Sequence, residues 1–456
     1  MAGIGFELRK LLRKESYLGL LQAYAFAGVI SSGPWVLSII GILVIGILSA
    51  SVVAPNFLVG QFQTTVTYLM LTSLILTGLV QLGFTRFISD RMYEKKDDMV
   101  LPNFNGLLLL VVVVSGALGV TAALTLFPGE SDFYRVLVMS CFVILCCIWV
   151  ATIFLSGMKQ YKEIVALFGL GYAVTVVSSL TLRPLGMEGL LLGFVIGHFV
   201  LLTGMVTMTL RNYPSTYFIA FDFLKKGAMY PSLILTGLIY NLGIWADKLL
   251  FWYWPETSQA IIGPLRASLI YDLPVFLAYL AIIPGMAVFL VRIETDFVEY
   301  FEKFYDAVRE GGSLDHIETM REEMVFTIRQ GLAEIVKIQA IAVLIVFVAG
   351  PALLDWLGIS QLYLSLLYVD VVASGLQVVL LGQLNIFFYL DKRLTVLFVT
   401  SLFLILNFGL TAITLQLGAA FYGYGFALAL LITVMVAMHL LERRLHRLEY
   451  ETFMLQ

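Results

Sequence analysis

Long stretches without a charged residue recur along this chain, and they constrain its fold more than any other feature. The first begins at Leu20 and the last ends near residue 441. A helix needs about 20 consecutive apolar residues to cross the hydrocarbon core of a bilayer. Of the 456 residues, 60% are hydrophobic and 13% are charged, which is too few charged residues to cover a soluble protein of this size. The sequence therefore predicts an all-α protein that is embedded in a membrane along its whole length.

We expect about twelve transmembrane helices. They are placed at 20–49, 63–85, 103–127, 135–157, 164–183, 188–210, 228–254, 268–291, 336–357, 364–389, 394–417 and 420–441. Only the short link 183–187 separates the fifth helix from the sixth, and Gly350-Pro351 is expected to kink the ninth helix.

Lysines and arginines are distributed unequally between the two sides of this arrangement. All but four of the 28 basic residues fall on one side, the exceptions being Arg135, Arg183, Lys248 and Arg266. Basic loops stay in the cytoplasm, so this side and both termini are predicted to be cytoplasmic. We expect an amphipathic N-terminus over 1–19 and a tail over 442–456, with short interfacial helices at Glu7–Lys14 and Glu442–Glu449.

Similar patterns recur about 210 positions apart and indicate an internal repeat. Gly33-Pro34-Trp35 in the first span corresponds to Gly243-Ile244-Trp245 in the seventh, and Arg86 to Asp90 corresponds to Arg292 to Asp296. We expect an N-lobe over 20–210, a linker over 211–227 and a C-lobe over 228–441, related by an axis along the membrane normal. Two such lobes would leave a cavity between them; the alternative is a duplicated scaffold without a transport path.

Ionisable residues inside the spans are the main candidates for function, because such groups are costly in a membrane and usually face protein or water. Asp247 and Lys248 lie in the seventh span, Asp272 near the outer end of the eighth, and Asp370 about two turns into the tenth. One interpretation is that the three acids pair locally with Lys248 and Arg266 or lie among the lipid headgroups. The other is an acidic outward vestibule for a cationic or amine-bearing substrate, or a proton or cation site.

Neutral polar and aromatic residues are further candidates for contacting a substrate. Gln377 offers an amide, and Tyr240, Trp245 and Tyr271 offer faces on which a sugar could stack. Such groups also suit ordinary hydrogen bonds between helices. In the sixth span, the spacing of Gly189, Gly193 and Gly197 predicts close helix packing, with His198 as a packed and hydrogen-bonded residue.

The longest loop, 293–335, is expected to be cytoplasmic. Phe297, Phe301, Phe304 and Val308 fall on one face of a helix, and Gly311-Gly312-Ser313 then breaks it. A second amphipathic stretch follows and leads into the ninth span. We therefore expect a helical hairpin in 293–335, which either docks a soluble partner or covers the end of the bundle.

Signals for an enzyme are missing from the sequence. There is no Gly-x4-Gly-Lys-Ser/Thr and no His-Glu-x-x-His, and the 4 histidines are scattered. We therefore expect neither catalysis, nor a metal, nor a cofactor. The 3 cysteines, Cys141, Cys146 and Cys147, share one apolar run, which predicts buried, reduced thiols.

The opening residues Met1-Ala2-Gly3-Ile4-Gly5-Phe6-Glu7-Leu8-Arg9-Lys10, the chain length and the stretch Trp245-Ala246-Asp247-Lys248 resemble the PelG family. This family is the polytopic inner-membrane component of the bacterial Pel exopolysaccharide system, and it is similar to the polysaccharide-transporter branch of the MOP flippase superfamily. The resemblance covers the whole chain. It implies twelve helices in two lobes and export of a polymer rich in N-acetylgalactosamine and partly deacetylated, for the biofilm matrix.

The resemblance also implies partners. A cytosolic glycosyltransferase, PelF, would supply the growing chain, and PelD and PelE would be membrane partners, with PelD sensing cyclic di-GMP. In cation-coupled multidrug relatives an acid in the first helix is central, whereas the first span here has Ser31 and Ser32 and no acid. Three hypotheses follow: a polymer exporter driven by chain synthesis, an ion-coupled flippase for a lipid-linked or small substrate, and a scaffold that recruits the synthase without conducting sugar.

Overall fold

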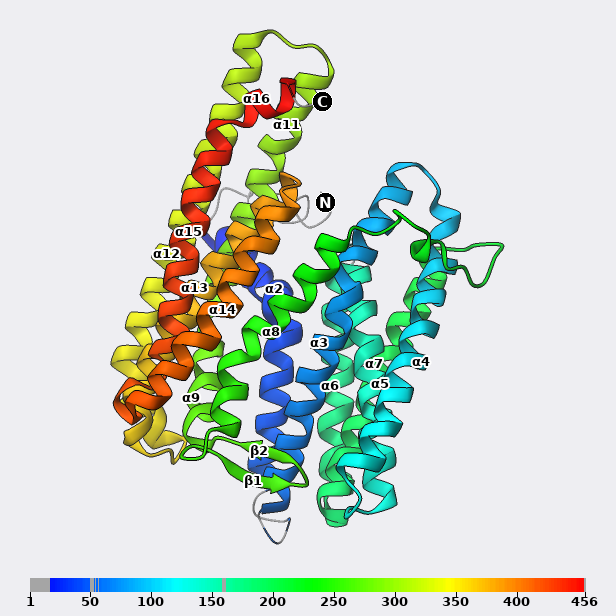
Figure 1. Cartoon of the computed structure of the whole chain (residues 1–456), viewed down its shortest axis with the longest axis vertical. Helices are drawn as coiled ribbons and strands as arrows, with labels where there is room; N and C mark the ends of the chain where they lie inside the picture. The colour runs from blue at the N-terminus through cyan, green and yellow to red at the C-terminus, as the bar shows by residue number, and fades with distance from the viewer. Residues whose placement is uncertain (1–16, 50–52, 54, 56, 158–160, 455–456) are drawn as a thin grey trace. The chain divides into compact units, whose positions relative to one another are not determined.

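The computed structural model describes residues 17–49, 53, 55, 57–157 and 161–454, and helices dominate it (Figure 1). The expected interfacial helix at Glu7–Lys14 and the opening ten residues lie outside this part. The helices are α2 (Tyr17–Ser49), α3 (Phe57–Tyr93), α4 (Val100–Leu126), α5 (Asp132–Gly157), α6 (Tyr161–Leu182), α7 (Gly186–Asn212), α8 (Pro231–Tyr253), α9 (Leu269–Leu280), α10 (Ile283–Val291), α11 (Val298–Arg309), α12 (Leu314–Trp356), α13 (Leu364–Tyr389), α14 (Arg393–Leu417), α15 (Tyr424–His446) and α16 (Leu448–Met454).

The chain divides into two compact units. Unit 1 comprises Met1–Ser32, Ala246–Leu250 and Ile270–Gln456, and unit 2 comprises Gly33–Trp245 and Phe251–Leu269. Each is described by itself below. The lobe boundaries predicted from the sequence, 20–210 and 228–441, stay a prediction.

The helices account for the expected number of membrane crossings. Within the described residues, nine helical stretches are long and apolar enough to cross a membrane, and two further pairs qualify when each is joined across a short break. One of the nine, Lys162–Asn212, has 51 residues. At 1.5 Å per residue it would be about 77 Å long, more than twice the thickness of the hydrocarbon core. It contains α6 and α7 with a turn at Arg183–Leu185, and therefore supplies two crossings. The chain is a multi-pass membrane protein.

Small residues let α6 and α7 of unit 2 approach closely. The hydroxyl of Ser178 donates to the carbonyl of Gly193 at 2.9 Å, and that of Ser179 to Leu190 at 3.0 Å. A side chain at Gly193 or Gly197 would overlap the facing backbone of α6. The predicted packing role of these glycines is confirmed. His198 is also packed as predicted: Nδ1 lies 2.9 Å from the Phe194 carbonyl and Nε2 lies 3.3 Å from the Tyr172 hydroxyl.

Aromatic and sulfur-containing side chains fill the core of unit 2. Phe84, Phe104 and Phe154 are buried there, with Phe104 stacked on Phe154 at a ring distance of 4.6 Å. Cys146 and Cys147 belong to the same cluster, and all three cysteines are free and buried, as predicted. A two-stranded hairpin, β1 (Gln259–Ile262) paired antiparallel with β2 (Leu265–Ala267), follows α8.

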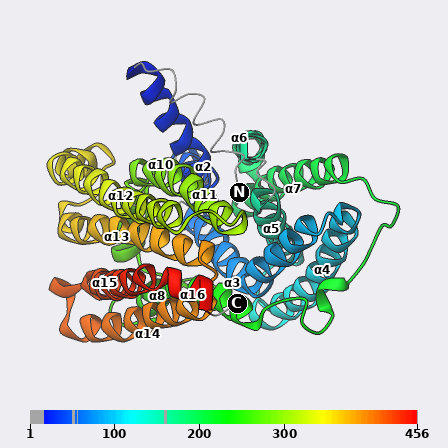
Figure 2. The same cartoon turned by 90° about the horizontal axis from the view of Figure 1, so that it is seen from above.

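In unit 1, α13 lies between α12 and α15, and α14 packs against α15 (Figure 2). The α12 helix runs for 43 residues and continues through Pro351. Proline has no N–H to donate to the carbonyl four residues earlier. Here that carbonyl, of Phe347, accepts a hydrogen bond of 2.8 Å from the Tyr368 hydroxyl of α13. The neighbouring helix thus satisfies the group that the proline leaves unpaired.

Side chains of two neighbouring helices also bond to the backbone at the break between α9 and α10. The two helices meet at an angle of 41°. The Ser374 hydroxyl of α13 donates to the Ala278 carbonyl at 3.1 Å, and the Gln339 amide of α12 donates to the Ile282 carbonyl at 3.2 Å. Both carbonyls also accept backbone hydrogen bonds, from Ala281 and Met286, so the neighbouring helices reinforce the break.

The expected helical hairpin in 293–335 is present in unit 1. It is formed by α11 and the first turns of α12, with Gly311 in a left-handed turn conformation at φ 69°. Figure 1 shows α11 and α16 beside these turns. Ion pairs connect the elements: Arg321 with Glu449 at 2.9 Å, and Glu451 with Lys392 at 2.5 Å and Arg444 at 2.8 Å.

Candidate functional site

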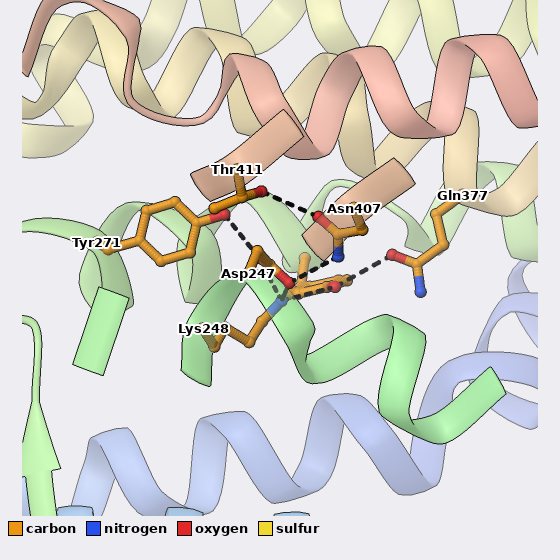
Figure 3. A network of polar contacts seen from close by, with 7 residues as sticks. Asp247, Lys248, Tyr271, Gln377, Asn407 and Thr411 are labelled. Carbon is orange, nitrogen blue, oxygen red and sulfur yellow. Dashed lines mark hydrogen bonds and ion pairs between the residues drawn. The ribbon is translucent and has the colours of Figure 1, made fainter. Parts of the chain in front are cut away.

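The centre of unit 1 holds a buried carboxylate that is bonded on several sides (Figure 3). Asp247 of α8 is fully buried. Its Oδ2 accepts a hydrogen bond of 2.6 Å from the Tyr271 hydroxyl of α9, and its Oδ1 accepts one of 3.1 Å from the Asn407 amide of α14. The Thr411 hydroxyl in turn donates to Asn407 Oδ1 at 3.2 Å. Three helices therefore fix the position of one carboxylate.

The charge of Asp247 is balanced by the next residue in the chain. Lys248 Nζ lies 3.1 Å from Asp247 Oδ2 and 3.4 Å from the Tyr279 hydroxyl. The ammonium also lies over two rings, 5.2 Å from the centre of Tyr279 and 5.0 Å from that of Phe426. Desolvating an ion pair is costly unless the remaining donors and acceptors are satisfied. The two tyrosines, the asparagine and the phenylalanine ring provide that compensation.

A second carboxylate in unit 1 lacks such compensation. Asp370 of α13 is 1% exposed, and neither of its oxygens has a hydrogen-bond partner among the described residues. The start of α15 lies next to it: a Cβ at Gly423, which precedes α15 with φ 84°, would be 3.1 Å from Asp370 Oδ1. Burying a charge without hydrogen bonds costs several kcal/mol. A carboxylate in this position can bind a proton or a small cation.

The structure separates the predicted site residues into groups. Asp247, Lys248 and Tyr271 meet in one network, and Gln377 joins it by accepting a hydrogen bond of 3.1 Å from Tyr279. Asp272 is half-buried, unlike the two buried acids.

Two of the proposed stacking faces differ in exposure. Trp245 belongs to unit 2 and is buried, with its ring 6.1 Å from that of Trp252. Tyr240 is half-buried. Of the residues proposed to stack on a sugar, Trp245 and Tyr271 are therefore buried in the protein interior.

Asn407 and Thr411 were missed at the sequence level. An amide within an apolar run is expensive to bury without a partner, and a threonine four residues later lies on the same helix face. This spacing was the available signal. Nothing in the sequence identified Asp247 as the partner, because the two residues are 160 positions apart.

The apolar face of α11 is turned into unit 1. Phe297, which directly precedes α11, and Phe304 are buried, and Phe301 and Val308 are half-buried. The rings of Phe297 and Phe301 lie 5.4 and 5.6 Å from that of Tyr389 on α13. These side chains cover the end of the bundle, and the exposed face of α11 carries charges of both signs, Glu302 and Asp306 beside Lys303 and Arg309.

Comparison with known proteins decides the family. The model of the family PelG, described as "Putative exopolysaccharide Exporter (EPS-E)", matches residues 1–453. The chain belongs to the PelG family. It is thus a member of a family of exopolysaccharide exporters, and the membership predicted from its opening residues is confirmed. None of the curated proteins matches this sequence.

Solved structures confirm the predicted fold class. The chain resembles an outward-facing multidrug resistance MATE family transporter of the MOP superfamily, with a TM-score of 0.64, 15% identity, and coverage of 93% of this chain and 96% of that chain. A MATE protein in the bent conformation gives a TM-score of 0.63 at 16% identity, with 99% of each chain covered. A MOP superfamily transporter from Pyrococcus furiosus gives 0.60 at 15% identity, covering 93% of this chain and 96% of that one. The fold is that of the MOP transporters.

Proposed function

We propose that this protein moves the Pel polysaccharide across the bacterial inner membrane for the biofilm matrix. The family match over residues 1–453 carries the proposal, and the MOP transporter fold supports it. Both termini lie in the cytoplasm, where the basic residues concentrate, and the protein has no catalytic activity of its own.

The partners follow from the same system. PelF delivers the growing chain from the cytosol, and PelD and PelE are membrane partners. We place the contact with PelF on the exposed charged face of α11, since the predicted docking residues Phe297 and Phe304 are buried. Replacing Glu302 with lysine is expected to reduce co-purification with PelF. The matched control is Asp132→Lys, which changes an exposed acid at the start of α5. Equal co-purification of both variants would contradict this contact.

Gln377, Tyr240 and Asp272 are the half-buried candidates for contact with the polymer. Amide and phenol groups bond sugar hydroxyls, and a carboxylate favours the amines of deacetylated sugars. Asp247 is less suited to attract an amine from outside, because Lys248 already balances its charge. We therefore expect Asp272→Asn to reduce export of deacetylated polymer more than export of fully acetylated polymer.

A deletion strain with its complement tests the proposed function. An exporter predicts that cells lacking this protein still synthesise polymer but retain it in the cytoplasm, and that the complement restores secretion. A scaffold predicts that polymer synthesis itself stops. Proteoliposomes that contain the protein and its synthase give the same distinction, because translocated polymer is protected inside the vesicles from an added glycoside hydrolase. Unprotected polymer in vesicles that synthesise normally would contradict export by this protein.

Asp370 favours a second candidate function, an ion-coupled flippase. Its two oxygens have no hydrogen-bond partner in the described part of the chain, so they can exchange a proton or cation during transport. The Asp247 carboxylate cannot do so without losing its ion pair with Lys248. Asp370→Asn is expected to fold normally and to abolish the dependence of export on the pH gradient. If export by the unaltered protein does not depend on the pH gradient, this candidate is excluded. Chain synthesis would then be the driving force.

A further inference from the structure

The connection between α7 and α8 in unit 2 exposes an unusual run of apolar side chains. Tyr217, Phe218, Ile219, Phe221 and Leu224 are between 41 and 71% exposed. Single exposed apolar residues are normal on a protein surface, but a contiguous group marks a contact with another apolar phase or molecule. We call residues 217–224 the aromatic segment.

Hydrogen bonds to α4 fix the backbone of the aromatic segment, so the positions of its exposed side chains are defined by the fold. The Ala220 amide donates to the Pro102 carbonyl at 2.9 Å, and the Asn105 amide donates to the Phe218 carbonyl at 2.9 Å. Asn103 bonds Asp222 twice, at 2.8 Å and 3.1 Å. Figure 2 shows this connection running along α4.

One side chain of the segment fixes it to the core. Phe223 is 1% exposed, and its ring lies 5.5 Å from that of Phe84 and 6.5 Å from that of Phe87. A side chain at Gly106 of α4 would overlap the Ala220 carbonyl, so the glycine permits the close approach. The polar groups of the segment and the rings of Phe221 and Phe223 thus lie toward α4 and the core, whereas Tyr217, Phe218, Ile219 and Leu224 are exposed.

The contacts with α4 give the depth of the segment. They involve Pro102, Asn103 and Asn105 in the first turns of α4. The exposed apolar face of this span begins at Leu109 and continues through Val112 and Val113. Leu109 is one turn beyond Asn105, about 6 Å along the helix. The aromatic segment therefore lies just outside the hydrocarbon core, at the level where aromatic side chains are enriched in membrane proteins.

We propose that the aromatic segment is an interfacial anchor that inserts its side chains into the headgroup region of one leaflet. Its ligand is a phospholipid surface, and the exposed Lys226 that follows it contacts the phosphate groups. The exposed side chains of the aromatic segment continue the exposed apolar face of α4, which favours lipid over a protein partner. The anchor fixes the depth of unit 2 in the bilayer. Export of a polymer does not by itself require such an anchor.

Site-directed spin labelling in proteoliposomes tests the anchor. Labels are placed at Phe218→Cys, at Val113→Cys as the lipid reference, and at Asp132→Cys, whose side chain is 95% exposed, as the water reference. The unaltered protein, whose three cysteines are buried, gives the background. Because Phe218 is exposed, its replacement leaves the core intact; elution as a single peak checks this.

The anchor predicts that the label at 218 collides more with oxygen than with a water-soluble nickel chelate, with a depth between the two references. The label at Phe223→Cys is expected to be protected from both reagents if the variant elutes as a single peak. A nickel accessibility at 218 equal to that at 132 would overturn the proposal. Protection at 218 that develops only when a partner protein is added would overturn it too, in favour of a protein-docking surface.

Discussion

The two units bury polar residues of different kinds. In the described part of unit 2 the buried polar side chains are neutral, as in Asn103, Thr175 and His198, and no Asp, Glu, Lys or Arg is among them. Unit 1 buries Asp247, Lys248 and Asp370. Similar helical bundles therefore have interiors with very different electrostatic costs.

The difference shows which polar residues folding can explain. In unit 2 the hydroxyl of Thr175 donates to the Gly171 carbonyl of its own helix at 2.9 Å, and many buried threonines do the same. Such bonds are local and replaceable. In unit 1, Asp247 needs Lys248 and donors from two other helices. Asp370 has no hydrogen-bond partner among the described residues, so folding does not explain its burial.

The largest effect is expected from breaking the buried ion pair. Lys248→Met leaves Asp247 as an uncompensated buried charge, which costs about 3–5 kcal/mol. Denaturant unfolding in detergent should show this loss, and the cellular level of the protein should fall. The double variant Asp247→Asn with Lys248→Met removes both charges and should recover much of the stability. Lys226→Met, at an exposed lysine, is the control. A single Lys248→Met variant as stable as the control would contradict the account.

A smaller effect is expected from removing one donor to Asp247. Asn407→Leu deletes the hydrogen bond of 3.1 Å to Oδ1 and leaves the Thr411 hydroxyl without its acceptor. The expected destabilisation is about 1–3 kcal/mol, the cost of leaving a buried charged group short of one partner. Combined with Asp247→Asn, the same change should cost less. Additive effects of the two substitutions would show that Asn407 acts independently of the carboxylate.

Unit 2 should tolerate the loss of one buried side-chain hydrogen bond better than unit 1 does. Thr175→Val replaces a buried hydroxyl by a methyl group of similar shape, and the Gly171 carbonyl keeps its helical hydrogen bond. The expected loss is below about 1 kcal/mol. The same unfolding assay measures it. A loss as large as that of Asn407→Leu would remove the contrast between the two interiors.

The smallest effect is expected from the charges at the end of the bundle. Burial raises the pKa of Glu451, but hydrogen bonds and ion pairs with Lys392 and Arg444 outweigh it and hold the pKa below its ordinary value. Glu451 therefore stabilises the fold above the ordinary glutamate pKa of about 4.3, and this stability is lost as the pH falls through the lowered value.

Comparing unfolding of Glu451→Gln with that of the unaltered protein at neutral and acidic pH measures this contribution. Partly exposed ion pairs contribute about 0–1 kcal/mol. The difference should be largest at neutral pH and should vanish in acid. A difference that grows in acid would have the wrong sign for a carboxylate that is stabilised in its charged form.

Much of this architecture was predictable because apolar length and charge asymmetry are local properties of the sequence. The spans, the packing of Gly193 and Gly197, and the hairpin after Phe297 all follow from residues close together in the chain. The site was only half predictable. The acids were identifiable as costly residues, but Asn407 and Phe426 were not, because their partners lie far away in the sequence. The exposed fraction of Phe297 also depends on a distant residue, Tyr389 of α13.

The most direct test of the account is export by Asp370→Asn. No hydrogen bond among the described residues is lost in this variant, so its stability and membrane content should match those of the unaltered protein. If the buried charges of unit 1 serve transport, secreted polysaccharide should fall at least about tenfold, equivalent to about 1.4 kcal/mol, while intracellular polymer accumulates. Normal secretion by a stably folded Asp370→Asn protein would contradict this central claim.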